Sequence, residues 1–370
     1  MKQSDSALSL SDVLKNVNKK YGAGTLSYAE DNEGLEVEVM PTGCFSLDDV
    51  LGIGGLPKGR VIDVYGAPSS GKTALCMHLM AQVQKNGGSA AFIDAEFSFS
   101  SDYARKLGVD TEKLVFMQPD TGEEAFEVIE KLVHTGEIDL IVVDSTAALV
   151  PSSELEGEIT DHNVALQARL LSKGLRMITG AAAKTKTTII FISQVRDKIG
   201  SFVGPATDST GGKAIKFFSS VRLEVNRIKS IEGDNKSVIG NRLKIKAVKN
   251  KVAPPFKEAE IELYFESGID LAVDALEFGE KLGVVGKSGN TYLFAGEKIA
   301  VGRDGAANAL RANKTLYENL KKAISEAHES SKSVTRAAQG ERKEPQEDEA
   351  GSSPEAAAAK AGANKPTKTV

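Results

Sequence analysis

Short runs of apolar residues alternate with longer amphipathic stretches along most of the chain. The runs cover residues 60–66, 89–96, 113–119, 138–146 and 187–195. Between them, apolar residues recur three and four positions apart, as in 74–85, 122–136 and 163–186. Continuous apolar strands separated by helices are typical of a parallel sheet with helices on both faces. The pattern predicts an α/β core over residues 35–270.

Three further apolar runs follow without long helices between them. They cover residues 220–232, 241–249 and 259–265. Strands that follow one another so closely pair in antiparallel fashion, because parallel pairing needs a long crossover connection. The sheet is therefore expected to be mostly parallel and twisted, with an antiparallel extension.

The chain changes character after residue 270. Residues 271–328 contain a helix-like stretch, a hairpin-like stretch and a closing helix, which predicts a small α/β C-terminal domain. From Glu329 onward Ser, Ala, Gly, Pro and mixed charge dominate the composition. Such a segment cannot bury enough apolar surface to fold, so residues 329–370 are expected to form a disordered tail.

A polar helix is expected within an N-terminal segment of residues 1–34. Ser11 and Asp12 offer the side chains that favour a helix start. One face carries a narrow apolar stripe, comprising Val13, Leu14 and Val17. A narrow stripe buries little surface, so the helix packs either on its own core or, as a polymerisation helix, on a neighbouring subunit.

Composition narrows the class of protein. The 370 residues are 41% hydrophobic and 26% charged, as in ordinary globular domains. No apolar run approaches the roughly 18 residues that span a bilayer, and the first residues lack a signal-peptide core, so we expect a cytoplasmic protein without membrane contact. Cys44 and Cys76 lack the spacing of a metal or redox motif. The net charge of −5 argues mildly against nucleic acid as a partner but leaves room for a local basic groove.

The stretch "GAPSSGKT" stands between a predicted strand and a predicted helix. Gly66 and Gly71 allow backbone angles at which successive N–H groups converge on one anion, and the helix N-terminus favours bound phosphate. Lys72 is placed to neutralise phosphate charge, and Thr73 to bind Mg²⁺ through its hydroxyl. An ordinary glycine-rich turn is the simpler interpretation, but the full pattern favours a phosphate-binding loop for ATP or GTP. Its members are Gly66, Ala67, Pro68, Ser69, Ser70, Gly71, Lys72 and Thr73.

Three polar side chains end predicted strands beside this loop. Asp144 is placed to hold Mg²⁺ or the waters around it. Glu96 is a candidate to orient or deprotonate the attacking water. Gln194 is a candidate sensor of the γ-phosphate. Each one alone is more often a solvated strand end, so the hypothesis depends on their association with the phosphate-binding loop.

Two long segments, residues 152–165 and 195–214, follow successive strands and end at the same edge of the sheet. Unstructured loops of this length are usually functional or disordered, and ligands of open α/β sheets bind at this edge. The first loop is acidic, so DNA contact would need basic side chains nearby. Those available are Arg169, Arg176, Arg196, Lys198 and Lys213.

Taken together, these motifs resemble the bacterial RecA recombinase family. The stretches "GAPSSGKT", "FIDAE", "QPDTGEEA", "LIVVDS", "STGGKAIKF" and "VKNKVAPPF" occur in the family order and at the family spacing, over about residues 5–325. The resemblance implies a RecA-like P-loop ATPase core and an enzyme that uses ATP and Mg²⁺. It also implies a helical filament on single-stranded DNA, pairing with homologous duplex DNA, strand exchange, and assisted self-cleavage of a LexA-type repressor.

The resemblance also assigns roles to individual residues. Tyr103 would stack on adenine, while Lys249 and Lys251 would reach the ATP of the neighbouring subunit. The lysines have a simpler interpretation as part of a solvated strand face. Phe217 would lie in the subunit interface, and Lys72, Glu96 and Gln194 would act in catalysis. The loops 152–165 and 195–212 would bind DNA, with contacts from Arg169, Ser172, Arg176, Arg196, Ile199, Gly211 and Gly212.

The chain departs from the family pattern at several positions. Phe97 stands where His is frequent, and Ser100 replaces an acid near adenine. Either Tyr264 or Phe265 fits the aromatic position at the adenine edge. The middle of the second loop differs, so its central residues are not assigned. The tail balances seven acids with seven bases, unlike the often acidic tail of the family.

Two other classes of protein fit part of the pattern. A hexameric helicase or another RecA-like motor would share the phosphate-binding loop and the carboxylates but lack "KNKVAPPF" and both loop signatures. A scaffold that binds ATP only to polymerise would not need Glu96 and Gln194. A filament rather than a ring on single-stranded DNA would exclude the helicase, and DNA-stimulated ATP hydrolysis would exclude the scaffold.

Overall fold

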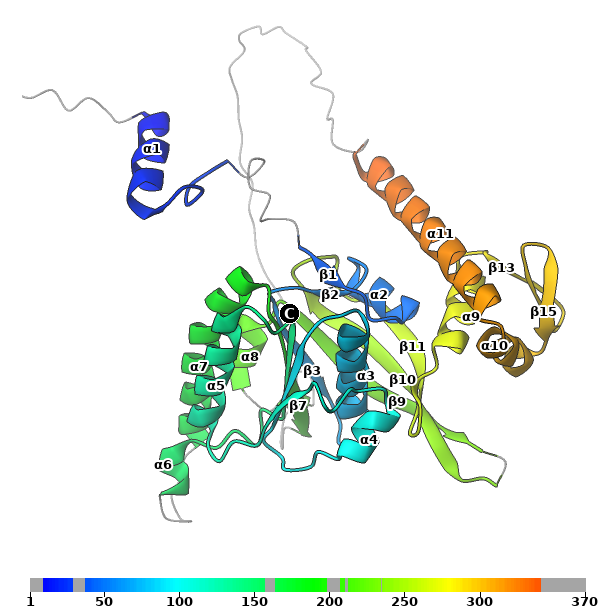
Figure 1. Cartoon of the computed structure of the whole chain (residues 1–370), viewed down its shortest axis with the longest axis horizontal. Coiled ribbons are helices and arrows are strands. Elements are labelled where there is room, and N and C mark those ends of the chain that lie inside the picture. Colours follow the sequence, from blue (N-terminus) through cyan, green and yellow to red (C-terminus); the bar gives the residue numbers. More distant parts are fainter. Residues whose placement is uncertain are drawn as a thin grey trace, which may run out of the picture. The chain divides into compact units, whose positions relative to one another are not determined.

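The computed structural model describes residues 9–28, 37–156, 164–197, 207–209, 212–233 and 235–340. The chain forms two compact units, residues 1–324 and 325–370. The large sheet lies in the first unit (Figure 1). None of the helices in the described ranges is both long and apolar enough to cross a membrane.

Among the described residues, ten strands form one sheet (Figure 1), whose main path runs β12-β11-β10-β9-β3-β7-β6-β4-β5 with β8 beside β7. The parallel part comprises β9 (Val221–Glu232), β3 (Val61–Gly66), β7 (Thr188–Asp197), β6 (Leu140–Asp144), β4 (Ala90–Asp94) and β5 (Val115–Met117). The antiparallel part adds β10 (Val238–Asn250), β11 (Glu258–Tyr264), β12 (Gly268–Ile269) and β8 (Thr207–Ser209). The expected strands and the antiparallel extension are confirmed.

Successive residues of the central strands face opposite sides of the sheet, so they pack against different helices. In β6, Leu140 and Val142 belong to the apolar cluster that includes α3 (Lys72–Lys85). Ile141 and Val143 belong to the cluster on the other face, which includes α5 and α7. These helices span Gly122–Thr135 and Val164–Thr185. Helices therefore cover both faces, as the continuous apolar runs predict.

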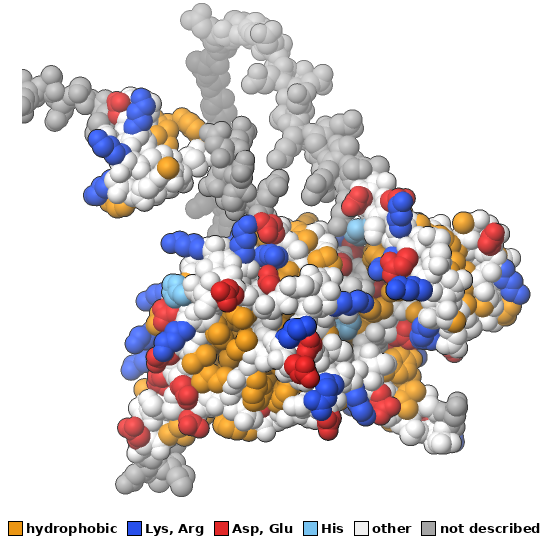
Figure 2. All heavy atoms as spheres, viewed as in Figure 1, with side chains coloured by type: hydrophobic (Ala, Val, Ile, Leu, Met, Phe, Trp, Pro, Cys, Tyr) orange, Lys and Arg blue, Asp and Glu red, His pale blue; other side chains and the backbone are white. Residues whose placement is uncertain are grey.

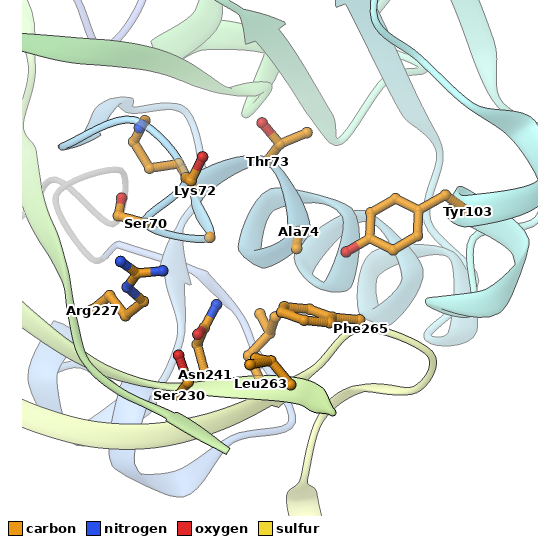
Figure 3. Close-up of a pocket in the computed structure, with 13 residues that line it drawn as sticks. Ser70, Lys72, Thr73, Ala74, Tyr103, Arg227, Ser230, Asn241, Leu263 and Phe265 are labelled. Carbon is orange, nitrogen blue, oxygen red and sulfur yellow. The ribbon is translucent and has the colours of Figure 1, made fainter. Parts of the chain in front are cut away.

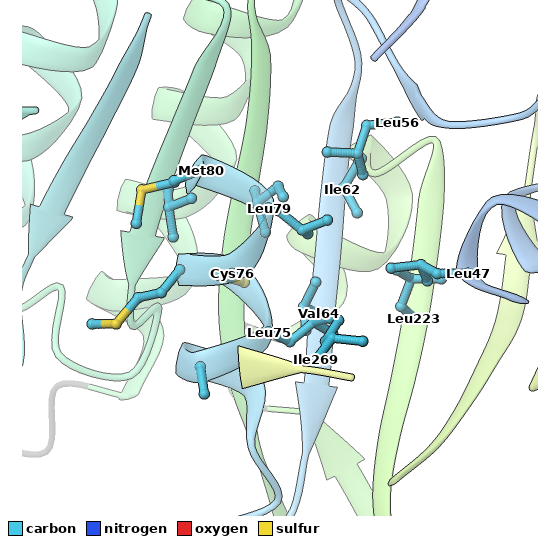
Figure 4. Packing of buried hydrophobic residues seen from close by; sticks show 14 of the residues in the cluster. Leu47, Leu56, Ile62, Val64, Leu75, Cys76, Leu79, Met80, Leu223 and Ile269 are labelled. Atoms are coloured by element: carbon cyan, nitrogen blue, oxygen red, sulfur yellow. The ribbon is translucent and has the colours of Figure 1, made fainter. Parts of the chain in front are cut away.

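Helix α3 fastens the phosphate-binding loop to the core. Leu75 and Leu79 of this helix face Val64 of β3 in the apolar cluster (Figure 4). Cys76 on the same helix and Cys44 are fully buried in that cluster. Burial disfavours the thiolate and raises the pKa of both thiols well above the usual range. The start of α3 is therefore held in place by packing of the helix, worth about 1.5–3 kcal/mol for each buried leucine.

The N-terminal helix α1 spans Leu10–Tyr21. Its N-cap is Ser9, and not Ser11 or Asp12 as expected. Ser9 Oγ accepts a hydrogen bond from the Asp12 amide at 3.2 Å and donates one to the Asp12 carboxylate at 2.6 Å. Asp12 thus stands three residues after the cap, where an acid complements it. No residue of α1 is buried, so the surface that its apolar stripe covers stays a prediction.

The C-terminal domain has its own apolar cluster. Its elements are α9 (Leu271–Lys281), β13 (Val285–Ser288), β14 (Thr291–Phe294), β15 (Glu297–Val301), α10 (Arg303–Ala312) and α11 (Lys314–Gly340). Helix α11 extends beyond residue 328, where the composition predicts the tail to begin. The sequence from there to Gly340 contains no proline to stop a helix. Residues 341–370 lie outside the described residues.

Short elements that the apolar pattern does not predict fill the connections. They are β1 (Val39–Met40), α2 (Phe45–Leu51), β2 (Leu56–Pro57), α4 (Ser101–Lys106), α6 (Ser152–Leu155) and α8 (Gly212–Phe218). Residues 195–214 are not one unstructured loop, since the end of β7, strand β8 and the start of α8 lie within them. Residues 157–163, 198–206 and 210–211 lie outside the described residues.

Candidate functional site

The phosphate-binding loop lies against the β9–β10 ribbon, which leaves no room for a side chain at Gly66 and little at Gly71. A Cβ on Gly66 would lie 2.1 Å from the carbonyl oxygen of Val225 in β9. A Cβ on Gly71 would lie 3.0 Å from Leu243 of β10, and Gly71 has a φ of 89° as the N-cap of α3. The sequence therefore needs glycine at both ends of the loop, for space and for backbone angle.

Lys72 and Ser70 direct polar groups into this loop. The Lys72 ammonium donates to the carbonyl oxygens of Gly66 at 3.1 Å and Ala67 at 2.8 Å. Burial lowers the pKa of Lys72, although the charges of Asp144 and Glu96 oppose that shift. Within the described part of the chain, the buried Ser70 Oγ has no hydrogen-bond partner.

The loop therefore offers glycine backbone at both ends, the Lys72 ammonium and the Ser70 hydroxyl, which has no hydrogen-bond partner among the described residues. These groups suit a phosphate chain, because phosphate oxygens accept hydrogen bonds and carry the opposite charge. The helix N-terminus adds the positive end of its dipole at the same place.

The three side chains that were expected at strand ends come together as the sheet order requires, since β4 and β7 flank β6. Gln194 lies within β7, which continues to Asp197. Thr73 Oγ1 donates to Asp144 Oδ2 at 2.6 Å. Glu96 Oε1 accepts hydrogen bonds from Ser145 Oγ and, at 2.9 Å, from Gln194 Nε2. The cluster joins a threonine hydroxyl, two carboxylates and an amide beside the loop.

Asp144 is the most perturbed acid of this cluster. Its pKa is raised to about 6, first by burial and then by the charges of Glu96 and Asp94, while the hydrogen bond from Thr73 opposes the shift. A hard cation would relieve the repulsion between these carboxylates, and oxygen ligands are those that Mg²⁺ prefers. The donor set therefore fits Mg²⁺ next to a phosphate chain.

A pocket of about 430 Å³ extends from the loop between α3, α4 and the β9–β10 ribbon. Tyr103, Leu263 and Phe265 form an apolar end of this pocket (Figure 3). Burial raises the pKa of Tyr103, so its phenol stays neutral. Sequence reasoning leaves Tyr264 and Phe265 as alternatives. Phe265 lines this pocket, whereas Tyr264 turns away and donates its hydroxyl to Glu262 at 3.3 Å.

The ribbon adds three polar side chains that sequence reasoning missed: Arg227, Ser230 and Asn241 (Figure 3). A β-bulge explains the miss. Arg227 pairs with Leu243 and Lys229 with Arg242, so Ile228 is an extra residue in the ladder. Strict alternation would place Arg227 and Ser230 on opposite faces, but the bulge turns both toward the pocket. Nothing in the local sequence marks the bulge.

Lys249 and Lys251, which are expected to reach a neighbouring subunit, lie apart from the other lysines of this part of the chain. Lys244 and Lys246 pair with Glu258 on the neighbouring strand. Lys249 instead lies opposite Arg222 in the ladder and donates to the carbonyl oxygens of Lys216 and Phe217 at the end of α8. Lys251 is exposed at the end of the strand.

The expected interface residue Phe217 is 71% exposed, which is unusual for a phenylalanine. Lys249 donates a hydrogen bond to the carbonyl oxygen of Phe217 at 3.2 Å. A large exposed ring beside the two lysines forms a surface that a second subunit can cover.

The expected DNA contacts are described only in part. Arg169, Ser172 and Arg176 line a shallow groove on α7, and positive and negative side chains are interspersed over the face shown in Figure 2. Arg196 lies in β7 and Gly212 opens α8. Ile199 and Gly211 lie outside the described residues.

Comparison with known proteins covers nearly the whole described chain. Residues 8–270 match the family model of the RecA N-terminal domain, and residues 273–329 match that of the RecA C-terminal domain. Three curated relatives bear the name Protein RecA. That of Saccharopolyspora erythraea is 46% identical over 322 residues, 87% of this chain and 93% of the relative. That of Leifsonia xyli subsp. xyli is 47% identical over 320 residues, 86% and 89% of the two chains. That of Kineococcus radiotolerans is 48% identical over 322 residues, 87% and 92% of the two chains.

Three findings point to the same family. Two of its family models match in sequence order, the relatives align over almost their full length, and the site combines a phosphate-binding loop with carboxylates at the neighbouring strands. The chain belongs to the RecA family of ATP-dependent DNA recombinases.

Proposed function

We propose that this chain forms a helical filament on single-stranded DNA, pairs that strand with homologous duplex DNA and promotes strand exchange, using ATP and Mg²⁺. As a member of its family, it is a DNA-dependent ATPase. The observation that carries the chemical part of the proposal is the cluster in which Ser145 and Gln194 both bond Glu96 beside the Thr73–Asp144 pair.

The loop from Gly66 to Thr73 would hold the phosphate chain through its N–H groups and the Lys72 ammonium. Thr73 would hold Mg²⁺ directly and Asp144 through a bound water; the ion supplies charge neutralisation at the phosphates. Tyr103 and Phe265 would take the adenine ring between them, because they form the apolar end of the pocket.

Glu96 would accept a proton from the attacking water. The hydrogen bonds from Ser145 and Gln194 hold its carboxylate in one orientation, as positioning of a general base requires. Gln194 would give up that bond when its amide turns to the γ-phosphate. Since residues 195–212, the second segment expected to bind DNA, follow Gln194 directly in the chain, the same movement would reach the DNA.

The contacts proposed with a neighbouring subunit, with DNA and with a repressor are based on the family and on which side chains are exposed. Lys249, Lys251 and Phe217 would meet the neighbouring subunit and its ATP. Single-stranded DNA would lie along α7 and the two loops, with contacts to the backbone from Arg169, Ser172, Arg176, Arg196, Ile199, Gly211 and Gly212. A LexA-type repressor would be a further partner of the filament.

One experiment tests the catalytic assignment together with the assembly. Glu96→Gln should lose ATP turnover on poly(dT) by 100-fold or more, on the order of a general-base contribution. It should keep nucleotide binding and form filaments with single-stranded DNA in electron micrographs. Glu137→Gln is the matched control, because Glu137 is exposed and remote from the loop. Undiminished turnover in Glu96→Gln would refute the base, and rings in place of filaments would refute the assembly.

A further inference from the structure

A buried carboxylate lies beneath the turn that carries Glu96. Asp94 ends β4 and has no exposed surface. Its Oδ1 accepts a hydrogen bond from the Ser98 amide at 3.2 Å. Its Oδ2 accepts two, from the Phe99 amide at 3.0 Å and from Gln118 Nε2 at 2.9 Å. Asp94 therefore binds the chain on the far side of the turn and also the residue that follows β5.

The three donors to Asp94 are neutral, and the type of residue decides how many of them it can bind. A buried carboxylate costs free energy unless hydrogen bonds satisfy its oxygens. Both of its oxygens accept, whereas the side chain of asparagine accepts at one atom and donates at the other. Because the two backbone amides bind different oxygens, an acid holds both at once and an asparagine would lose one.

The turn that these bonds close contains an uncommon backbone conformation. The amides of Ala95 and Glu96 donate to the carbonyl oxygen of Asp144 in β6 at 2.8 and 3.1 Å. Phe97 comes next with a φ of 55°, in the left-handed region that a bulky side chain rarely adopts. Such a conformation persists only where the surrounding structure fixes it. The backbone amides that bind Asp94 follow Phe97 in the chain, so β6 holds the turn at its start and Asp94 holds it at its end.

Glu96 extends from the middle of this turn, so the position of its carboxylate depends on the backbone beneath it. Ser145 Oγ and Gln194 Nε2 both donate to Glu96 Oε1. These two bonds orient the carboxylate, and the turn sets the point from which the side chain extends. Misplacement of a reacting group by about 1 Å can cost about 100-fold in rate. A loosened turn would therefore slow hydrolysis without removing any group that binds ATP.

We infer that Asp94 is a positioning residue for ATP hydrolysis: its buried carboxylate closes the turn on which Glu96 stands and so fixes the base that accepts the proton of the attacking water. This inference rests on the proposed role of Glu96. Gln118 supports the arrangement from the neighbouring strand, because its amide binds the same oxygen of Asp94 as the Phe99 amide.

The test is ATP hydrolysis on poly(dT) by Asp94→Asn. The substitution keeps the shape of the side chain but leaves either the Ser98 or the Phe99 amide facing an NH2 group. We expect kcat to fall by about 10-fold or more, while KM for ATP and the affinity for poly(dT) change by less than about 2-fold. An unchanged kcat in the folded variant would overturn the inference.

Asp274→Asn is the matched control. Asp274 in α9 is 5% exposed, and its two carboxylate oxygens accept hydrogen bonds from the Phe45 and Ser46 amides. The substitution removes the same kind of bond in the C-terminal domain, so it should lower the melting temperature and leave kcat unchanged. An equal loss of kcat in both variants would show that Asp94→Asn acts through stability alone, and the inference would fail.

A double variant separates this inference from the proposed function. If Asp94 acts through Glu96, Asp94→Asn combined with Glu96→Gln should turn over no more slowly than Glu96→Gln alone. A merely structural role predicts that the two losses multiply, in which case the inference fails and the base stands. If Glu96→Gln keeps full turnover, both fail.

Gln118→Met provides a second test should Asp94→Asn not fold. It removes one donor to Asp94 and keeps both backbone bonds of the turn. We expect kcat to fall by about 2-fold or more, as for the loss of one hydrogen bond, when Glu96 is present and not when it is replaced by Gln. Full turnover in Gln118→Met would count against the inference. Melting temperatures of all variants establish that the compared proteins are folded.

Discussion

His78 shows at the scale of one residue how burial fixes a protonation state. It is 4% exposed in α3, and its Nε2 lies 3.1 Å from the carbonyl oxygen of Thr42. Burial lowers the pKa of His78 from 6.5 to about 4, because the interior disfavours the charged ring. The unfolded chain takes up this proton near pH 6.5 and the folded chain only near pH 4, so stability falls as the pH falls through that window.

His78→Gln should remove this part of the acid sensitivity. The expected difference between the two proteins, comparing urea unfolding at pH 7.5 and pH 4.5, is at most about 3 kcal/mol, from 1.36 kcal/mol for each unit of pKa. His134→Gln is the control, because His134 is exposed and should leave the pH dependence unchanged. Equal pH dependence in wild type and His78→Gln would contradict the buried neutral ring.

Phe265 and Tyr264 show that the sequence alone does not decide which of two neighbouring aromatic residues lines the pocket. Both are aromatic neighbours, and alternation along β11 sends them to opposite faces, but the sequence does not say which face is the pocket. The structure places Phe265 in the pocket and Tyr264 against Glu262. Their register depends on pairing with β10, which local sequence does not encode.

Phe265→Ala should weaken binding of a fluorescent ATP analogue by about 10-fold or more, because one aromatic contact with a base is worth about 1–3 kcal/mol. Tyr264→Phe removes only a hydroxyl that points away from the pocket and should leave affinity unchanged. The reverse order of effects would show that Tyr264, not Phe265, meets the base.

At the scale of elements, the approach of α5 to α7 depends on a glycine. A Cβ on Gly174 of α7 would lie 2.4 Å from the ring of Phe126 in α5. Gly174→Ala should therefore lower the free energy of unfolding by about 1–3 kcal/mol through overpacking. Gly180 is in the same helix with no atom within 4 Å of its Cβ position, so Gly180→Ala should raise it by about 0.5–1 kcal/mol. Thermal unfolding of both variants measures the two effects. Equal changes in stability would contradict the close packing of α5 on α7 at Gly174.

Helices and strands were predictable where the spacing of apolar residues alone determines the structure. The central strands are apolar on both faces because helices cover both faces. This pattern can be recognised in each strand's own sequence, without knowing which strands pair with it. The β9–β10 ribbon was predictable as two strands but not in its detail, because its bulges depend on how two distant segments pair. As a result Lys72 was found from the loop motif and Asp144 and Glu96 from strand ends, whereas Arg227 and Asn241 were missed.

At the scale of the molecule, the proposed site is complete only between two subunits. A Lys249→Ala/Lys251→Ala double variant should bind ATP but not hydrolyse it on DNA, because the phosphates lose both cations of the neighbouring subunit. Mixed in equal amounts with Glu96→Gln, it should regain partial turnover. An intact Glu96 meets intact lysines at about one interface in four if the variants mix at random in a head-to-tail assembly.

Co-assembly in this mixture is checked by pulling down one tagged variant with the other. Turnover that stays at background while the variants co-assemble would refute the contribution of the lysines across the interface. The oligomer itself lies beyond what the apolar pattern can predict, since Phe217 and α1 are exposed in the single chain and the pattern does not say what covers them.

The burial of both thiols has a practical consequence for studying such an assembly. Cys44 and Cys76 are the protein's two cysteines, and both are fully enclosed with raised pKa values. Reactive reagents need an accessible thiolate, so the native protein should release no colour with a chromogenic disulfide until it is denatured. A single cysteine introduced at exposed Glu137 would then be the one labelled site. Fluorophores could follow strand exchange in the natural sequence background, without first removing its own cysteines.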